Sequence, residues 1–149
     1  MRRFDRLKDL ALVLAVKEVV RTEAAQNLSG LCANEDDRKH EENLAKRNVH
    51  ESATAWQACL NSRALDLQKL TYLAAELGVR HAEFEIANKK RAEAQRRTEQ
   101  ARAYYASCEA QVSQAELAVQ RVRKKLMRRS EERRLSAAED RTAYLRVTQ

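Results

Sequence analysis

The sequence predicts an all-α fold: a long antiparallel two-helix coiled-coil hairpin whose second helix projects past the first at its C-terminal end. The 149 residues include no proline and only two glycines, which nearly excludes folds with many tight turns. Ala, Glu, Lys, Leu and Arg account for 87 of the 149 residues, a bias typical of long helices and coiled coils. Apolar residues also recur at alternating steps of three and four, which places them on one face of a helix.

This apolar repeat is clearest in the second half of the chain. Steps of three and four residues from Leu70 to Leu126 visit seventeen positions, and fourteen of them are apolar. The exceptions are Arg80, Arg91 and Thr98. Because arginines occupy the next two positions, the apolar seam is expected to end at Leu126 while the helix continues.

A looser repeat runs through the first half, where ten of sixteen positions from Leu7 to Cys59 are apolar. The chain is therefore expected to form one coiled-coil domain over residues 1–149. Its first helix would span about residues 4–60, its turn residues 61–66 and its second helix about residues 67–145. The polar interruptions of the first seam are Lys17, Arg21, Glu35, Arg38, Glu42 and Ser52.

The predicted turn rests on local capping chemistry. Asn61 and Ser62 can end a helix, and Asp66 can cap the N-terminus of the next one. A competing turn lies at Gly78, since glycine is common just past helix ends. The unbroken seam on both sides of Gly78 argues against that alternative.

With this turn, Glu35 of the first seam is expected to face Arg91 of the second. Two polar intrusions that meet as an ion pair would specify the register, whereas either one alone would be costly.

Large apolar residues gather close to the turn, on more than one face of the helices. They either pack as a core around the turn or form a partner surface, because two helices cannot bury them all. These residues are Trp56, Leu65, Leu67, Leu70, Tyr72, Leu73 and Leu77.

Positive charge is concentrated at the C-terminal end. Residues 121–149 carry ten basic and four acidic side chains, so they hold six of the seven net charges of the chain. The hairpin would bring them close to the basic N-terminus. This basic block could be a solvated face, a nucleic-acid contact or a contact with an acidic protein groove.

Residues typical of catalysis do not form a recognisable pattern. The three histidines are far apart in the sequence, and both glycines stand alone, so neither a metal site, a catalytic triad nor a phosphate loop is predicted. We expect neither enzymatic activity nor a cofactor. The longest apolar run, Leu10 to Val16, is too short to cross a bilayer, and we expect a cytosolic protein with three reduced cysteines.

The chain resembles the FliJ/YscO/HrpO family of type III secretion stalk proteins over nearly its full length. The opening Arg2-Arg3-Phe4-x-Arg6-Leu7-Lys8-x-Leu10 looks like the N-terminal pattern of that family. Lys17-Glu18-Val19-Val20 and Ala24-Ala25 continue the pattern. Trp56 and the stretch Leu67-Gln68-Lys69-Leu70-Thr71-Tyr72-Leu73 are similar to the turn and the start of the second helix.

The resemblance implies a stalk whose paired termini enter the pore of the hexameric secretion ATPase and whose turn faces the export gate protein. It also implies binding of secretion chaperones, and it implies neither nucleic-acid binding nor membrane insertion. Four residues match the patch that contacts the gate in flagellar members: Leu70, Ala74, Leu77 and His81. The cations expected to meet the ATPase are Arg2, Arg3, Arg6, Arg121, Arg123, Lys124, Lys125, Arg128, Arg129, Arg133 and Arg134.

Two alternatives from other functional classes remain open. One is a coiled coil that binds nucleic acid through the basic block. The other is a structural homodimer in which one helix runs straight through the whole chain, without a turn at Asn61 to Asp66.

Overall fold

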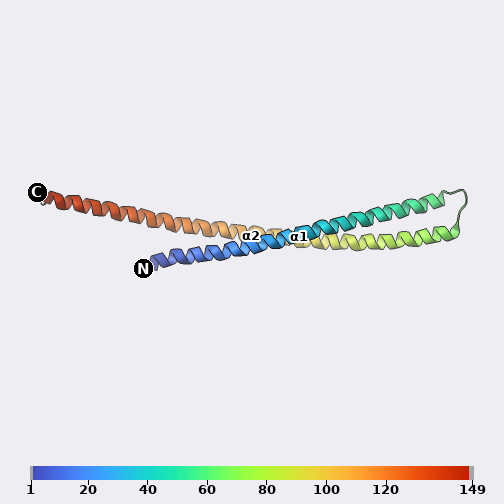
Figure 1. Cartoon of the computed structure of the whole chain (residues 1–149), viewed down its shortest axis with the longest axis horizontal. Helices are drawn as coiled ribbons and strands as arrows, with labels where there is room; N and C mark the ends of the chain where they lie inside the picture. The colour runs from blue at the N-terminus through green and yellow to red at the C-terminus, as the bar shows by residue number, and fades with distance from the viewer. Residues whose placement is uncertain (1, 148–149) are drawn as a thin grey trace. The chain divides into compact units, whose positions relative to one another are not determined.

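A computed structural model describes the backbone of residues 2–147 and the side chains of residues 6–141. Its two helices, α1 (Arg2–Leu60) and α2 (Leu67–Val147), run antiparallel and pack against each other (Figure 1). No strand occurs in this part of the chain. The predicted all-α helical hairpin is therefore confirmed. The alternative of one uninterrupted helix is wrong, because the chain leaves helical geometry after Leu60.

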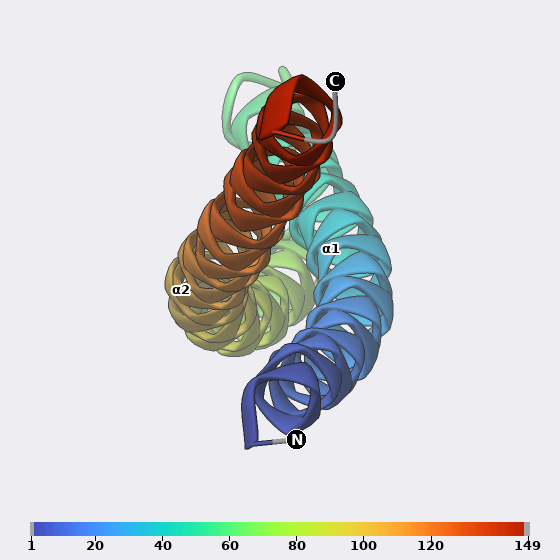
Figure 2. The same ribbon diagram turned by 90° about the vertical axis from the view of Figure 1, so that its left-hand side faces the viewer.

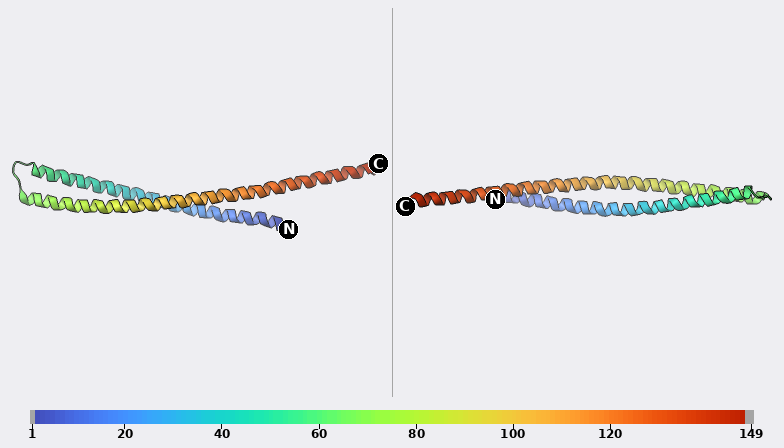
Figure 3. Two further views of the ribbon diagram at one scale, coloured as in Figure 1. Left: turned by 180° about the vertical axis from the view of Figure 1, so that it is seen from behind. Right: turned by 90° about the horizontal axis from the view of Figure 1, so that it is seen from above.

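The two helices contribute to two compact units. The hairpin unit is Ala24–Tyr105, and Figure 3 shows its helix-to-helix connection from two directions. The terminal unit combines Met1–Glu23 with Ala106–Gln149. Figure 2 views this unit from the side of the chain ends, with α1 in blue and α2 in orange to red.

The connection between the helices comprises residues 61–66, the residues predicted to form the turn. Ser62 ends α1: its hydroxyl lies 2.8 Å from the carbonyl oxygen of Cys59 and 2.9 Å from that of Ala64. Asp66 caps α2, because its Oδ1 accepts hydrogen bonds from the backbone N–H groups of Gln68 (3.0 Å) and Lys69 (3.1 Å). The predicted roles of Ser62 and Asp66 are confirmed, whereas Asn61 contributes only a backbone hydrogen bond to Gln57.

Both predicted seams are removed from solvent. All sixteen positions from Leu7 to Cys59 and all seventeen from Leu70 to Leu126 are buried or half-buried. Every described side chain from Met127 to Arg141 is exposed, so the seam ends where the sequence predicts. Outside the seams, the described side chains that are also half-buried are Ala25, Cys32, Asn48, Ala53, Glu76 and Ala118.

The most buried side chains are small, which lets the two helix backbones approach closely. Thr98, a polar exception in the predicted seam, is fully buried. The Thr98 hydroxyl donates a hydrogen bond to the carbonyl oxygen of Ala94, 3.1 Å away on the preceding turn, so this buried group has a partner. The buried apolar residues are Ala24, Ala45, Cys59, Ala87 and Ala94 in the hairpin unit, and Cys108, Val112 and Val119 in the terminal unit.

The predicted pairing of Glu35 with Arg91 is wrong, because Arg91 donates to Glu42 instead (Nη1 to Oε2, 3.0 Å). The Thr98 hydroxyl lies 3.4 Å from the carbonyl oxygen of Leu31, which fixes the level of the two helices. One heptad closer to the turn on both helices, Arg91 is level with Arg38 rather than with Glu35.

Two arginines at one level of a seam repel each other, so each turns toward a carboxylate. Arg38 pairs with Glu41 on its own helix (2.7 Å), and Arg91 reaches along α1 to Glu42.

The competing turn at Gly78 is wrong, since this residue lies inside α2 and has a negative φ. No heavy atom lies within 4 Å of a Cβ built on Gly78.

Replacing Gly78 by alanine is expected to raise the free energy of unfolding by about 1 kcal/mol, because alanine favours the helix and meets no neighbour. Urea unfolding followed by circular dichroism measures the change. The reverse substitution at a nearby exposed helical position, Ala75→Gly, should lower stability by a similar amount. Destabilisation by Gly78→Ala would contradict a continuous helix at this position.

Replacing Asp66 by alanine is expected to cost about 1 kcal/mol of unfolding free energy, because two N-terminal amides of α2 lose their acceptor. Asp66→Asn retains a side-chain oxygen acceptor and should remain close to wild type. Equal losses in both variants would argue against the cap.

A double-mutant cycle on Glu42 and Arg91, each changed to alanine, is expected to give a coupling energy of about 1 kcal/mol. The same cycle on Glu35 and Arg91 should be additive. If Arg91 coupled to Glu35 and not to Glu42, the register predicted from the sequence would be favoured over the observed one.

Candidate functional site

Three of the eleven cations predicted to form a binding site meet in the terminal unit. Arg6 of α1 lies beside Lys125 and Arg129 of α2, around an open cleft of about 280 Å³. Val122 and Leu126 are the apolar residues that line this cleft. Two segments far apart in the sequence therefore contribute positive charge to one site.

The end of the seam explains this arrangement. Arg6 immediately precedes Leu7, the first position of the α1 seam, and Leu126 is the last position of the α2 seam. Packing of the two apolar seams brings Leu7 and Leu126 together, and the cations next to these two residues are brought together with them. No ion pair joins the three cations to another described side chain, so the cleft attracts anions.

Cations surround α2 on all sides close to this cleft. Successive helical residues are rotated by about 100°, so the eight cations between Arg121 and Arg134 leave no gap around the helix wider than about 80°. Only two acidic residues, Glu131 and Glu132, interrupt this segment. We call it the basic helix; its cations, all exposed, are Arg121, Arg123, Lys124, Lys125, Arg128, Arg129, Arg133 and Arg134.

The side chains of Arg2 and Arg3, also predicted to belong to the site, lie outside the described ones. From Met127 onward, the described part of the basic helix is fully exposed, so α1 does not cover it.

The four residues matched to the gate-binding patch do not share one exposed face. Leu70 and Leu77 are half-buried in the seam against α1, while Ala74 and His81 are exposed.

Exposed apolar surface near the turn comes from other residues. Leu65, Leu67 and Tyr72 are 54%, 68% and 69% exposed. As predicted, two helices do not bury all the large apolar residues there. Trp56 is half-buried, and its indole Nε1 is buried without a hydrogen-bond partner.

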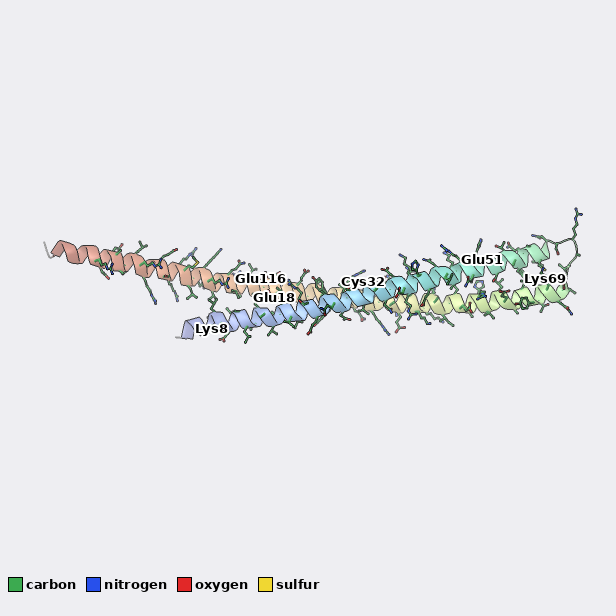
Figure 4. The ribbon with its side chains drawn as sticks, viewed as in Figure 1. Lys8, Glu18, Cys32, Glu51, Lys69 and Glu116 are labelled. Atoms are coloured by element: carbon green, nitrogen blue, oxygen red, sulfur yellow. The ribbon has the colours of Figure 1, made fainter. Side chains whose placement is uncertain are left out.

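An apolar groove in the terminal unit was not identified from the sequence. It has a volume of about 410 Å³ and is lined by residues of both helices. Figure 4 labels Lys8 and Glu18 on the stretch of α1 that contributes most of its lining. The sequence signal for this groove is the apolar run Leu10 to Val16. All seven of its residues are apolar, although the seam uses only Leu10 and Leu14. The groove is lined by Leu12, Val13, Val16, Lys17, Val20, Cys108 and Gln111.

Side chains that could support metal chemistry remain dispersed. Within the described residues, no three or more His, Cys, Asp or Glu side chains come together as metal ligands. Cys32, Cys59 and Cys108 are free thiols. The described helices also contain no stretch apolar and long enough to traverse a lipid bilayer.

Comparisons with protein-family models, with curated proteins and with solved structures found no match to this chain.

Proposed function

We propose that this protein is a non-enzymatic stalk of a type III secretion export apparatus. Its basic helix and Arg6 would engage the pore of the hexameric secretion ATPase, and its turn would face the export gate protein. This function would place it in the cytoplasm, peripheral to the inner-membrane secretion apparatus. Secretion chaperones are further proposed partners.

The observation that carries this proposal is the distribution of charge around the basic helix. Cations on one face of a helix are sufficient for contact with a flat acidic surface. Cations on every side suit a partner that surrounds the helix, such as an acidic hole through a ring. Exposure of every described side chain beyond Leu126 leaves the part of the basic helix from Met127 to Arg134 accessible to such a partner.

An asymmetric helix in a symmetric ring also has a mechanical use. Each of six identical subunits would meet a different side of the stalk, so the stalk can stabilise a different conformation at each position. Charge at the contact would guide insertion and favour one orientation more than it would add affinity.

The turn supports the second proposed contact. Leu65, Leu67 and Tyr72 are exposed apolar side chains close to the cap of α2, and contact with a partner protein would bury them. Of the four residues matched to the gate-binding patch, the two exposed ones, Ala74 and His81, would take part in the contact with the export gate protein.

Reversal of four cations tests the ATPase contact. The quadruple change of Arg128, Arg129, Arg133 and Arg134 to glutamate should reduce stimulation of the secretion ATPase from the same organism to its basal rate, because like charges would then meet in the pore. Steady-state ATP hydrolysis with increasing stalk protein measures this effect, and circular dichroism verifies that the helices persist.

The matched control reverses four exposed cations of the hairpin unit: Lys46, Lys89, Lys90 and Arg96. This variant has the same net charge and should stimulate normally. Unchanged stimulation by the first variant would refute the proposed placement. Tight binding of wild-type protein to duplex DNA with a steep salt dependence would favour the nucleic-acid alternative.

A further inference from the structure

The cationic cleft and the apolar groove of the terminal unit lie on the same side of both helices. On α1, Arg6 lines the cleft, whereas Val13 and Val20 line the groove. Successive members of this trio are seven residues apart, so they project from nearly the same side of the helix. On α2, Gln111 of the groove and Arg129 of the cleft are eighteen residues apart, which is five full turns. The two cavities therefore follow one another along one side of the α1–α2 pair.

The size of the groove suits a narrow aliphatic group. Leu12 and Val16, two of its lining residues, are 67% and 56% exposed. Its volume of about 410 Å³ is in the range of small-molecule pockets. A helix 10–12 Å across fills roughly 500 Å³ in each turn, so the groove holds less than one turn of a helix. An alkyl chain fits this space better than a partner helix does.

Positive charge is concentrated in the cleft. Arg6, Lys125 and Arg129 line it together, and no ion pair joins any of them to another described side chain. Lys8 and Asp9 lie between the cleft and the groove in the sequence, but they carry opposite charges and line neither cavity. Three cations without a counter-charge favour an anionic group at this end.

The groove itself carries little charge. Lys17 is the one charged residue among its lining residues, and its Nζ donates to Oε1 of Gln111 at 2.8 Å. Glu23 lies three residues beyond Val20, at the end of the groove remote from the cleft. This arrangement selects an occupant that is anionic at the cleft and uncharged along the groove.

The spacing of the two cavities sets the length of such an occupant. From Arg6 to Val16, in the middle of the groove, α1 advances by about 15 Å. An extended alkyl chain of about twelve carbons covers this distance, because each C–C bond of about 1.5 Å lengthens it by about 1.25 Å.

We propose that the terminal unit binds one molecule of a single-chain anionic amphiphile, a long-chain carboxylate or alkyl phosphate. Its head group is held in the cleft by Arg6, Lys125 and Arg129, and its alkyl chain lies in the groove. Both cavities belong to this protein alone, so the inference does not depend on the proposed ATPase contact.

Isothermal titration calorimetry of the full-length protein with three probes tests this proposal. The probes are dodecyl phosphate, dodecyltrimethylammonium and inorganic phosphate, each below the concentration at which micelles form. Dodecyl phosphate should bind one-to-one and at least tenfold more tightly than either other probe, because it alone complements both cavities. Equal affinities for the two dodecyl compounds, binding of several molecules, or no binding of dodecyl phosphate would overturn the proposal.

A pair of valine variants locates the alkyl chain. Val16→Glu should weaken the binding of dodecyl phosphate more than tenfold, because a carboxylate would then lie in the groove. The control is Val79→Glu in the hairpin unit, at a valine that is 57% exposed compared with 56% for Val16. This control should bind normally. Equal losses in both variants would contradict the groove as the site.

Reversal of two cleft cations locates the head group. The double variant Arg6→Glu and Lys125→Glu should bind dodecyl phosphate at least tenfold more weakly and lose the preference over dodecyltrimethylammonium. The control, Lys89→Glu with Lys90→Glu, reverses two exposed cations of the hairpin unit and has the same net charge. It should retain the preference. An equal loss in the control would show attraction by net charge alone and would overturn the cleft as the site.

Two further measurements distinguish other occupants. Sedimentation of the wild-type protein as a dimer that Val16→Glu converts to a monomer would show that a second copy covers the groove. Binding to phosphatidylglycerol vesicles without binding of monomeric dodecyl phosphate would show that a bilayer surface is the partner. Either result would overturn a single amphiphile as the occupant.

Discussion

Burial of small side chains along one stripe of each helix is the interaction on which the other features depend. An isolated helix is only marginally stable in water, and most of its stability in a protein comes from packing an apolar face. Alanine and cysteine at the most buried positions of the hairpin unit let the backbones come close enough for Thr98 to approach a carbonyl of the facing helix. The level of the two helices within the hairpin unit, and with it the contacts between facing side chains there, follows from this packing.

Much of the fold could be predicted because heptad spacing and capping are local properties of the sequence. All the seam positions and both caps of the turn follow from residue type and spacing. The partner of Arg91 could not be predicted in this way. It depends on how six turn residues set the level of the helices and on the reach of a long side chain, and neither is a local property.

The same contrast applies to the candidate sites. The cleft formed by Arg6, Lys125 and Arg129 could be anticipated, since a hairpin must bring the ends of its two seams together. The groove beside Leu12 and Val16 was missed because the seam test assigns each helix only one apolar face. Asking whether a short run is apolar on two faces would have identified it.

Trp56 has a consequence for how this protein can be observed. It is the single tryptophan in the chain, and it lies four residues before the end of α1 with its indole nitrogen buried and without a partner. Intrinsic tryptophan fluorescence therefore originates entirely beside the turn. Separation of the helices there would let water reach the indole and shift its emission to longer wavelength, so events at this end can be followed without adding a dye.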